Sequence, residues 1–271
     1  MRFSIILLFT FSLVFALLHT AMGQGFSVSP SRITFSGNPG ETVTQTITFS
    51  NSSSIPLSFV NRIQDWDRDS LGTKVYYDRN TRPLSNANWI SLSSNNTAIK
   101  SGETKQIIVS LTIPADANKL THSMIFFTQV KDQPPKPVTG ISLGINILME
   151  VGVQVYYTPK GLSSGEFEFM AFDDRGTVDK AGKKVRQLAV RIHNKGAINK
   201  DATLRCELTN KDTGEEVKLA SEIIAMLPDA TEWITLDLPA NLKGKFLAVV
   251  LLDAGSSYDL KVAEKEVIYR P

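Results

Sequence analysis

Short runs in which apolar and polar residues alternate follow one another along most of the chain, separated by Gly, Pro, Asn and Ser. The alternation is strictest from Ile107 to Ile113, where every odd position is apolar and Pro114 ends the run. A period of two indicates strands with one buried face, and no segment shows the longer period of a convincing amphipathic helix. The pattern predicts an all-β protein with sandwich topology.

Two sets of these runs predict two domains in tandem. The first set comprises 26–35, broken by Pro30, then 43–49, 57–66, 74–77, 89–92, 107–113 and 123–130. The second set comprises 166–172, 185–193, 202–208, 216–224, 232–238, 245–252 and 258–269. We place the boundary near Pro159, which gives two immunoglobulin-like β-sandwich domains, 24–159 and 160–271, each of the usual size for such a fold.

The start of the chain predicts export. An apolar run from Ile5 to Leu18 follows a basic residue and ends in small residues, as in a secretory signal over residues 1–23. The run has about fourteen residues, fewer than the roughly twenty that span a bilayer, so an uncleaved anchor is the lesser alternative. We expect a mature chain without a membrane span. Its single cysteine, Cys206, lies in an alternating apolar run, which predicts a buried thiol and no internal disulfide.

Charge and motifs argue against several classes of function. The 29 basic and 27 acidic residues nearly cancel and are scattered, so neither nucleic acid nor an anionic membrane is an expected partner. His122 and His193 lie far apart, and the sequence has neither a Cys/His cluster for zinc nor a Gly-x-Ser-x-Gly elbow. We therefore expect no enzyme, no metal and no cofactor.

Asp65, Asp67 and Asp69 alternate as the ligands of a calcium loop do. However, Ser70 and Tyr76 stand where that loop needs Gly and Glu, so the motif fails. We expect a solvated turn here.

Aromatic residues gather in the same region and allow two interpretations. They are Trp66, Tyr76, Tyr77 and Trp89. Such a group can form a face that stacks on carbohydrate, or its tryptophans can anchor a sandwich core. We favour the core.

One segment is unusual for a sandwich domain, because every odd position from Ile141 to Tyr157 is apolar. As a single strand at about 3.3 Å per residue it would reach roughly 56 Å, against a usual length near 20 Å. Part of it would then cross into the second domain or lie open as an edge that another strand can join. The alternative is two ordinary strands with a break at Gly144 or Gly152.

Three segments of the first domain resemble the periplasmic pilus-assembly chaperones of the PapD-like superfamily. They are Val28-Ser29-Pro30-Ser31-Arg32-Ile33-Thr34-Phe35, the turn and strand from Gly102 to Val109, and the run from Gln154 through Pro159 to Leu162. In that family two immunoglobulin-like domains enclose a binding cleft and a strand of the chaperone completes a partner's sandwich. The second domain is similar to the family only in being a predicted sandwich.

The resemblance implies roles for individual residues. Arg32 would be the cleft arginine, and the family inserts alternating apolar residues, here Ile145, Ile147 and Met149, into an incomplete subunit. Gln154 stands where the family has a lysine, so the second cation of the cleft is expected to be missing. Thr158 replaces an arginine, so the usual ion pair between the domains is also expected to be absent.

These observations predict a periplasmic, chaperone-like protein that binds exported fimbrial or other surface subunits by β-strand addition. The subunit-binding residues would be Arg32, Gln154, Ile145, Ile147 and Met149. The alternative is a structural or adhesive envelope protein whose two sandwiches tether partners without releasing them.

Overall fold

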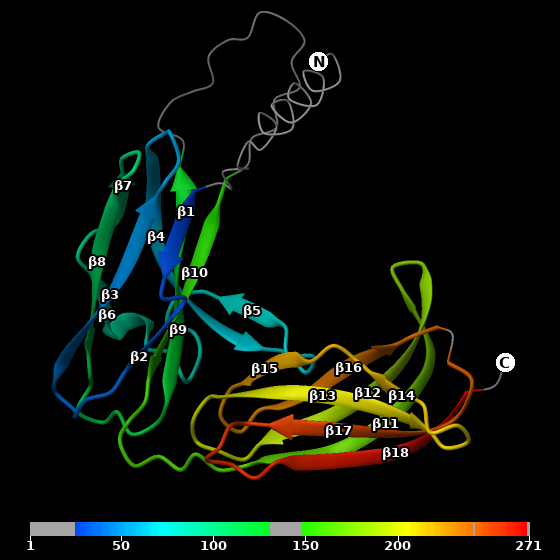
Figure 1. Cartoon of the computed structure of the whole chain (residues 1–271). Coiled ribbons are helices and arrows are strands. Elements are labelled where there is room, and N and C mark those ends of the chain that lie inside the picture. Colours follow the sequence, from blue (N-terminus) through cyan, green and yellow to red (C-terminus); the bar gives the residue numbers. More distant parts are fainter. Residues whose placement is uncertain (1–24, 131–147, 241, 270–271) are drawn as a thin grey trace, which may run out of the picture.

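The computed structural model describes residues 25–130, 148–240 and 242–269, and it confirms two immunoglobulin-like β-sandwiches in tandem (Figure 1). The first contains β1 (Phe26–Ser29), β2 (Arg32–Phe35), β3 (Thr42–Asn51), β4 (Leu57–Arg68), β5 (Lys74–Tyr77), a 3-10 helix η1 (Ala87–Trp89), β6 (Ile90–Leu92), β7 (Asn96–Ile99), β8 (Thr104–Thr112), β9 (Thr121–Val130) and β10 (Glu150–Tyr157). The second contains β11 (Phe167–Lys180), β12 (Lys183–Asn194), β13 (Lys200–Asn210), β14 (Glu216–Lys218), β15 (Glu222–Met226), β16 (Thr231–Leu238), β17 (Gly244–Asp253) and β18 (Lys261–Tyr269).

The first sandwich has one sheet in the order β1-β3-β8-β6 and another in the order β2-β10-β9-β4-β5, with β7 paired to β4. The chain changes sheets between β1 and β2, at the cis peptide bond between Ser29 and Pro30. Proline cannot donate to a ladder, which explains the break in the predicted first strand. Alternate side chains of both sheets fill the core, as the period-two pattern predicts.

The second sandwich packs the sheet β11-β12-β16 against the sheet β14-β13-β17-β18, with β15 paired to β13. Cys206 is 1% exposed in its core, which confirms the predicted buried thiol. Burial raises the pKa of this thiol to about 12, so it is protonated and unreactive at neutral pH. The predicted strand 216–224 is in fact two short strands, β14 and β15.

The two domains are in direct contact. A cluster of buried apolar side chains joins Trp66, Leu120, Met124, Phe126 and Tyr156 of the first domain to Leu227 of the second. Across the same interface Arg32 Nη1 lies 2.7 Å from Asp201 Oδ2, and the backbone N–H of Trp233 donates to Ser70 O at 2.8 Å. The domains are therefore linked by an ion pair at Arg32, which is a different pair from the one whose arginine Thr158 replaces.

No helix in the described ranges 25–130, 148–240 and 242–269 is long and apolar enough to cross a membrane.

Candidate functional site

Within the part of the chain that the structure describes, strand β10 has a neighbour on both sides over only half of its length. Strand β9 pairs with all of it, from Glu150 to Tyr157, whereas β2 pairs in parallel only with Gln154 to Tyr157. Among the described residues, no strand pairs with Glu150–Val153 on the β2 side. We call Glu150–Val153 the open edge. It exists because the first strand leaves this sheet at Pro30, and β1 pairs with β3 instead.

The hydrogen bonds on either side show which backbone groups face outward. Gln154 N donates to Ser31 O at 3.0 Å on the β2 side, while Gln129 N donates to Met149 O at 2.8 Å on the β9 side. Backbone groups of successive residues in a strand point to opposite sides. The N–H and C=O groups of Glu150 and Gly152 therefore point away from β9, into the open edge.

The predicted long strand is only partly described. Strand β10 has eight residues and begins at Glu150, and two of the predicted binding residues, Ile145 and Ile147, lie outside the described residues. The odd-numbered side chains from Val153 to Tyr157 are buried in the domain's own core. Met149 is partly buried against that core and lines a groove of about 330 Å³ with Phe26.

Arg32 and Gln154 are brought together, as the resemblance implies, because they are register partners on β2 and β10. The guanidinium of Arg32 is held between the Asp201 carboxylate and the ring of Tyr156, 5.7 Å from its centroid. Gln154 Oε1 accepts a hydrogen bond from Tyr156 Oη at 2.9 Å. Burial raises the pKa of Tyr156 to about 12, so its hydroxyl remains a neutral donor.

Two further cations lie beside Arg32, and the sequence alone does not reveal them. Lys74 of β5 has its Nζ 5.7 Å from the centroid of the Trp66 ring, and the guanidinium of Arg68 is equally far from that ring. Burial lowers the pKa of Lys74, and Arg68 and Arg32 lower it further. We call Arg32, Arg68 and Lys74 the cation cluster. Within the described residues, no hydrogen bond or ion pair satisfies Lys74 Nζ, and Asp201 is the carboxylate that pairs with Arg32.

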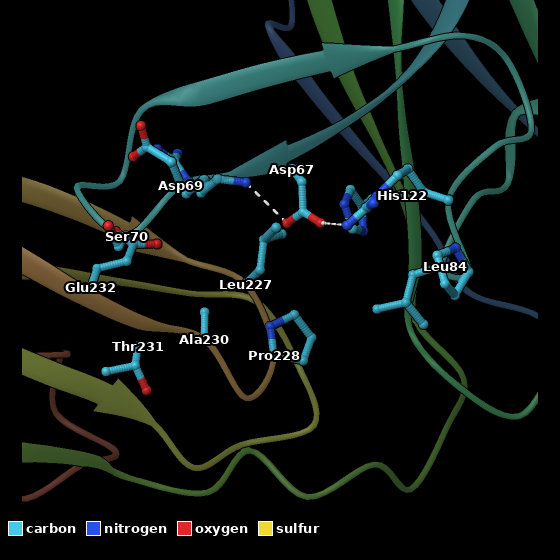
Figure 2. Close-up of a pocket in the computed structure, with 13 residues that line it drawn as sticks. Asp67, Asp69, Ser70, Leu84, His122, Leu227, Pro228, Ala230, Thr231 and Glu232 are labelled. Carbon is cyan, nitrogen blue, oxygen red and sulfur yellow. Dashed lines mark hydrogen bonds and ion pairs between the residues drawn. The ribbon is translucent and has the colours of Figure 1, made fainter.

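The acidic residues of β4 have structural tasks. Asp65 is 1% exposed and accepts hydrogen bonds from Thr81 N at 2.7 Å, Arg82 N at 2.8 Å and Ser85 Oγ at 2.6 Å. Asp67 forms an ion pair with Arg82 at 2.9 Å (Figure 2). The prediction of a solvated turn is therefore wrong for Asp65, because a loop distant in sequence folds over it.

The aromatic residues of this region do not share one exposed face. Trp66 is 1% exposed at the domain interface, and Trp89 packs edge-on against Tyr157 in the core at 5.7 Å between ring centroids. Trp89 thus packs against the sandwich core, as the favoured interpretation predicts, whereas Trp66 belongs to the cluster between the domains. Tyr76 is exposed, but it packs edge-on against Phe126.

Comparisons with known protein-family models and with the sequences of curated proteins find no match. Among solved structures, the chain is similar to the YadV chaperone at 10% identity and a TM-score of 0.48, over 90% of this chain and 100% of that one. It is similar to the CsuC–CsuE chaperone–tip adhesion subunit complex of Acinetobacter baumannii Csu pili at 12% identity and 0.47, over 88% and 97%. The E. coli chaperone DraB has 15% identity and 0.44, over 89% and 98%. All three are chaperones or a complex that contains one.

Proposed function

We propose that this protein is a non-enzymatic, periplasmic chaperone-like protein that binds exported fimbrial or other surface subunits by adding a strand at the open edge of β10. The observation that carries the proposal is the open edge itself, which lies next to the cation cluster. The open edge can form backbone hydrogen bonds with a strand of the partner. The cation cluster can bind a negative charge at the end of that strand. Together they fit an extended peptide segment that carries a carboxylate.

The open edge supports strand addition on energetic grounds. An unpaired edge is a hazard for a soluble protein, and natural sheets usually cover or shorten it. Here the N–H and C=O groups of Glu150 and Gly152 can continue the ladder that Gln154 makes with β2. Backbone hydrogen bonds of this kind provide affinity in β-strand addition, while side-chain pockets provide specificity.

The cation cluster supports recognition of a carboxylate. A guanidinium can hold a carboxylate in a bidentate manner, and the side chain of Arg32 is one third exposed. Lys74 supplies the second cation from β5, although Gln154 occupies the position where the family has a lysine. In the unbound protein the Asp201 carboxylate forms an ion pair with Arg32, so the carboxylate of a partner would compete with Asp201 for the guanidinium. Ile145, Ile147 and Met149 remain proposed apolar contacts that precede the open edge.

Replacing Gly152 tests the role of the open edge. Gly152→Pro removes one N–H that faces the open edge and leaves the bonds to β9 intact, because those come from odd-numbered residues. We expect this variant to lose most of its binding to the exported subunit, measured as the amount of subunit that co-purifies from the cell envelope.

Gly152→Ala is the matched control, since it adds the same Cβ but keeps the N–H. That Cβ would lie 3.0 Å from Met124 Sδ and 3.3 Å from Phe126 Cε1, a contact that both variants share and that flexible side chains can relieve. We expect the Ala variant to retain the subunit. Equal retention by two folded variants would contradict strand addition at this edge.

A further inference from the structure

Glu232 of β16 is an acidic side chain buried at the interface between the domains. It is 3% exposed, and its Oε1 has no hydrogen-bond partner within the described residues. Figure 2 shows it on the wall of a pocket of about 470 Å³, together with residues of the β4–β5 hairpin. An unpaired carboxylate in such a position is costly when ionised, because burial removes its hydration.

The tip of the β4–β5 hairpin, Asp69 to Thr73, covers Glu232. Trp233 N donates to Ser70 O at 2.8 Å, which ties the neighbouring residue of β16 to the tip. Gly72 lies so close that a Cβ there would be 2.6 Å from Glu232 Oε2. Asp69 Oδ1 accepts hydrogen bonds from Leu71 N and Thr73 N, both at 2.9 Å, which fixes the shape of the tip.

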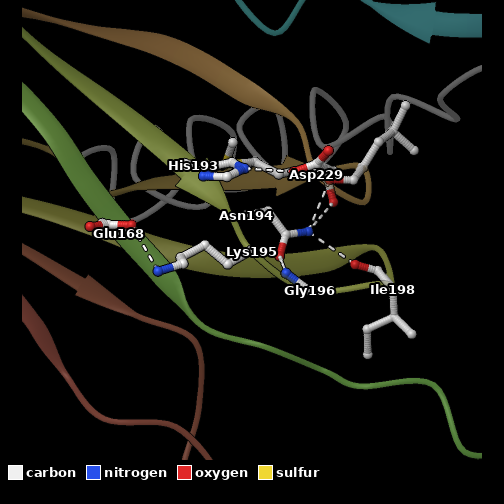
Figure 3. Close-up of polar contacts among 9 residues, drawn as sticks. Glu168, His193, Asn194, Lys195, Gly196, Ile198 and Asp229 are labelled. Carbon is white, nitrogen blue, oxygen red and sulfur yellow. Dashed lines mark hydrogen bonds and ion pairs between the residues drawn. The ribbon is translucent and has the colours of Figure 1, made fainter.

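In the second domain, the loop that precedes β16 is held in place by hydrogen bonds from Asn194. Asn194, fully buried, donates from Nδ2 to Ile198 O at 3.0 Å and to Leu227 O at 2.9 Å, and its Oδ1 accepts from Gly196 N at 3.0 Å. Figure 3 shows these bonds around Asn194 and the contact of His193 with Asp229. The loop from Leu227 to Ala230 is thereby anchored just before β16. The hairpin tip and the loop before β16 are thus both held in place by their own hydrogen bonds. The stability of the contact between the domains here therefore depends on Glu232.

The charged groups around Glu232 largely oppose one another. From the hairpin, Arg68 attracts a charged carboxylate and Asp69 repels it. Arg68 Nη1 already donates to Gly72 O. Asp67 and Arg82, which line the same pocket, are paired with each other, and His122 donates from Nε2 to Trp66 O at 2.9 Å. In the second domain, His193 of the neighbouring strand pairs with Asp229.

We propose that the contact between Glu232 and the hairpin tip is a pH-sensitive latch, which holds the two domains together while Glu232 is protonated and loosens when it ionises. The latch needs no bound partner, so it goes beyond the proposed function and stands or falls independently of it.

The direction of the pH dependence follows from the pKa of Glu232. Burial raises this pKa from its ordinary value of 4.5 to about 7, against the opposing effect of Arg68. The closed interface therefore binds more protons than the open one, and its stability falls as pH rises from about 4.5 through about 7. Protonation of His122, whose pKa burial lowers, would loosen the interface at acid pH and so acts in the opposite direction.

Hydrogen exchange at the Trp233 amide reports the latch directly, because its bond to Ser70 crosses the interface. We expect the protection factor of this amide, corrected for intrinsic exchange, to fall roughly ten- to a hundredfold between pH 5 and pH 8 in the purified protein. Glu232→Gln keeps the shape of the side chain without the charge and should remove the fall. Glu264→Gln, an exposed glutamate of β18, is the matched control and should keep it.

A wild-type protection factor that does not change across this range would overturn the latch. The same holds if Glu232→Gln shows the wild-type fall, or if the amide of Val250 in the second core loses protection in parallel, because the change would then be global.

Discussion

Lys74 is a half-buried cation whose neighbours repel it. Arg32 and Arg68 both disfavour its charge, and the ring of Trp66 offers it a weak attraction. An anion bound in the cleft would relieve this repulsion and gain charge-assisted hydrogen bonds. The free energy that such a ligand gains from Lys74 is therefore larger than that from an isolated surface lysine.

We expect Lys74→Met to weaken binding of the subunit roughly ten- to a hundredfold, since a hydrogen bond to a charged group contributes about 1.5–3 kcal/mol. Methionine keeps much of the apolar contact with Trp66. The dissociation constant, measured by titration calorimetry with the co-purified subunit, checks the value.

Lys119→Met is the control, because Lys119 is exposed and lies outside the cation cluster. The assignment of Lys74 to the site is wrong if both variants bind as tightly as the wild-type protein.

Strand β4 shows how a distant loop changes the role of a residue. Asp65 on this strand ties the 81–85 loop to the first sandwich through two backbone N–H groups and the Ser85 hydroxyl. Removing the carboxylate leaves these donors unpaired in a partly buried position. The loss of the Asp65 carboxylate should therefore lower the stability of the first domain and leave partner binding unchanged.

We expect Asp65→Ala to lower the free energy of unfolding by about 2–4 kcal/mol, measured by urea denaturation. Asp78→Ala, at an exposed aspartate of the same hairpin region, should change it by less than about 0.5 kcal/mol. Similar losses in both variants would show that Asp65 does not have this special role.

The alternation of apolar and polar residues predicts most strands, because it reflects a buried face that is local to each strand. It misses β7, whose polar Asn96 and Thr97 conceal a short strand paired only with β4. The alternation also does not predict that Lys74 lies near Arg32 or that Asp65 is buried. Both features arise because segments separated in the sequence come together in the fold. The Arg32–Asp201 pair joins residues 169 positions apart, and no local pattern encodes such a contact.

At the scale of the whole molecule, the proposed binding site and the proposed latch share Arg68, which belongs to the cation cluster and also attracts the Glu232 carboxylate. In the proposed function the open edge of β10 and the cation cluster bind the partner, and in the proposed latch Glu232 and the hairpin tip set how firmly the domains are held together. The Arg32–Asp201 ion pair belongs to both, because it links the domains and occupies the cleft arginine. Binding of a carboxylate at Arg32 is therefore expected to change the interface between the domains.

Amide hydrogen exchange of β10 in the free protein and in its complex with the co-purified subunit tests the central claim most directly. The amides of Val151 and Val153 point to β9 and should be protected in both states. Those of Glu150 and Gly152 should exchange readily in the free protein and become protected in the complex. A stoichiometric complex in which these two amides exchange as fast as in the free protein would contradict strand addition at the open edge.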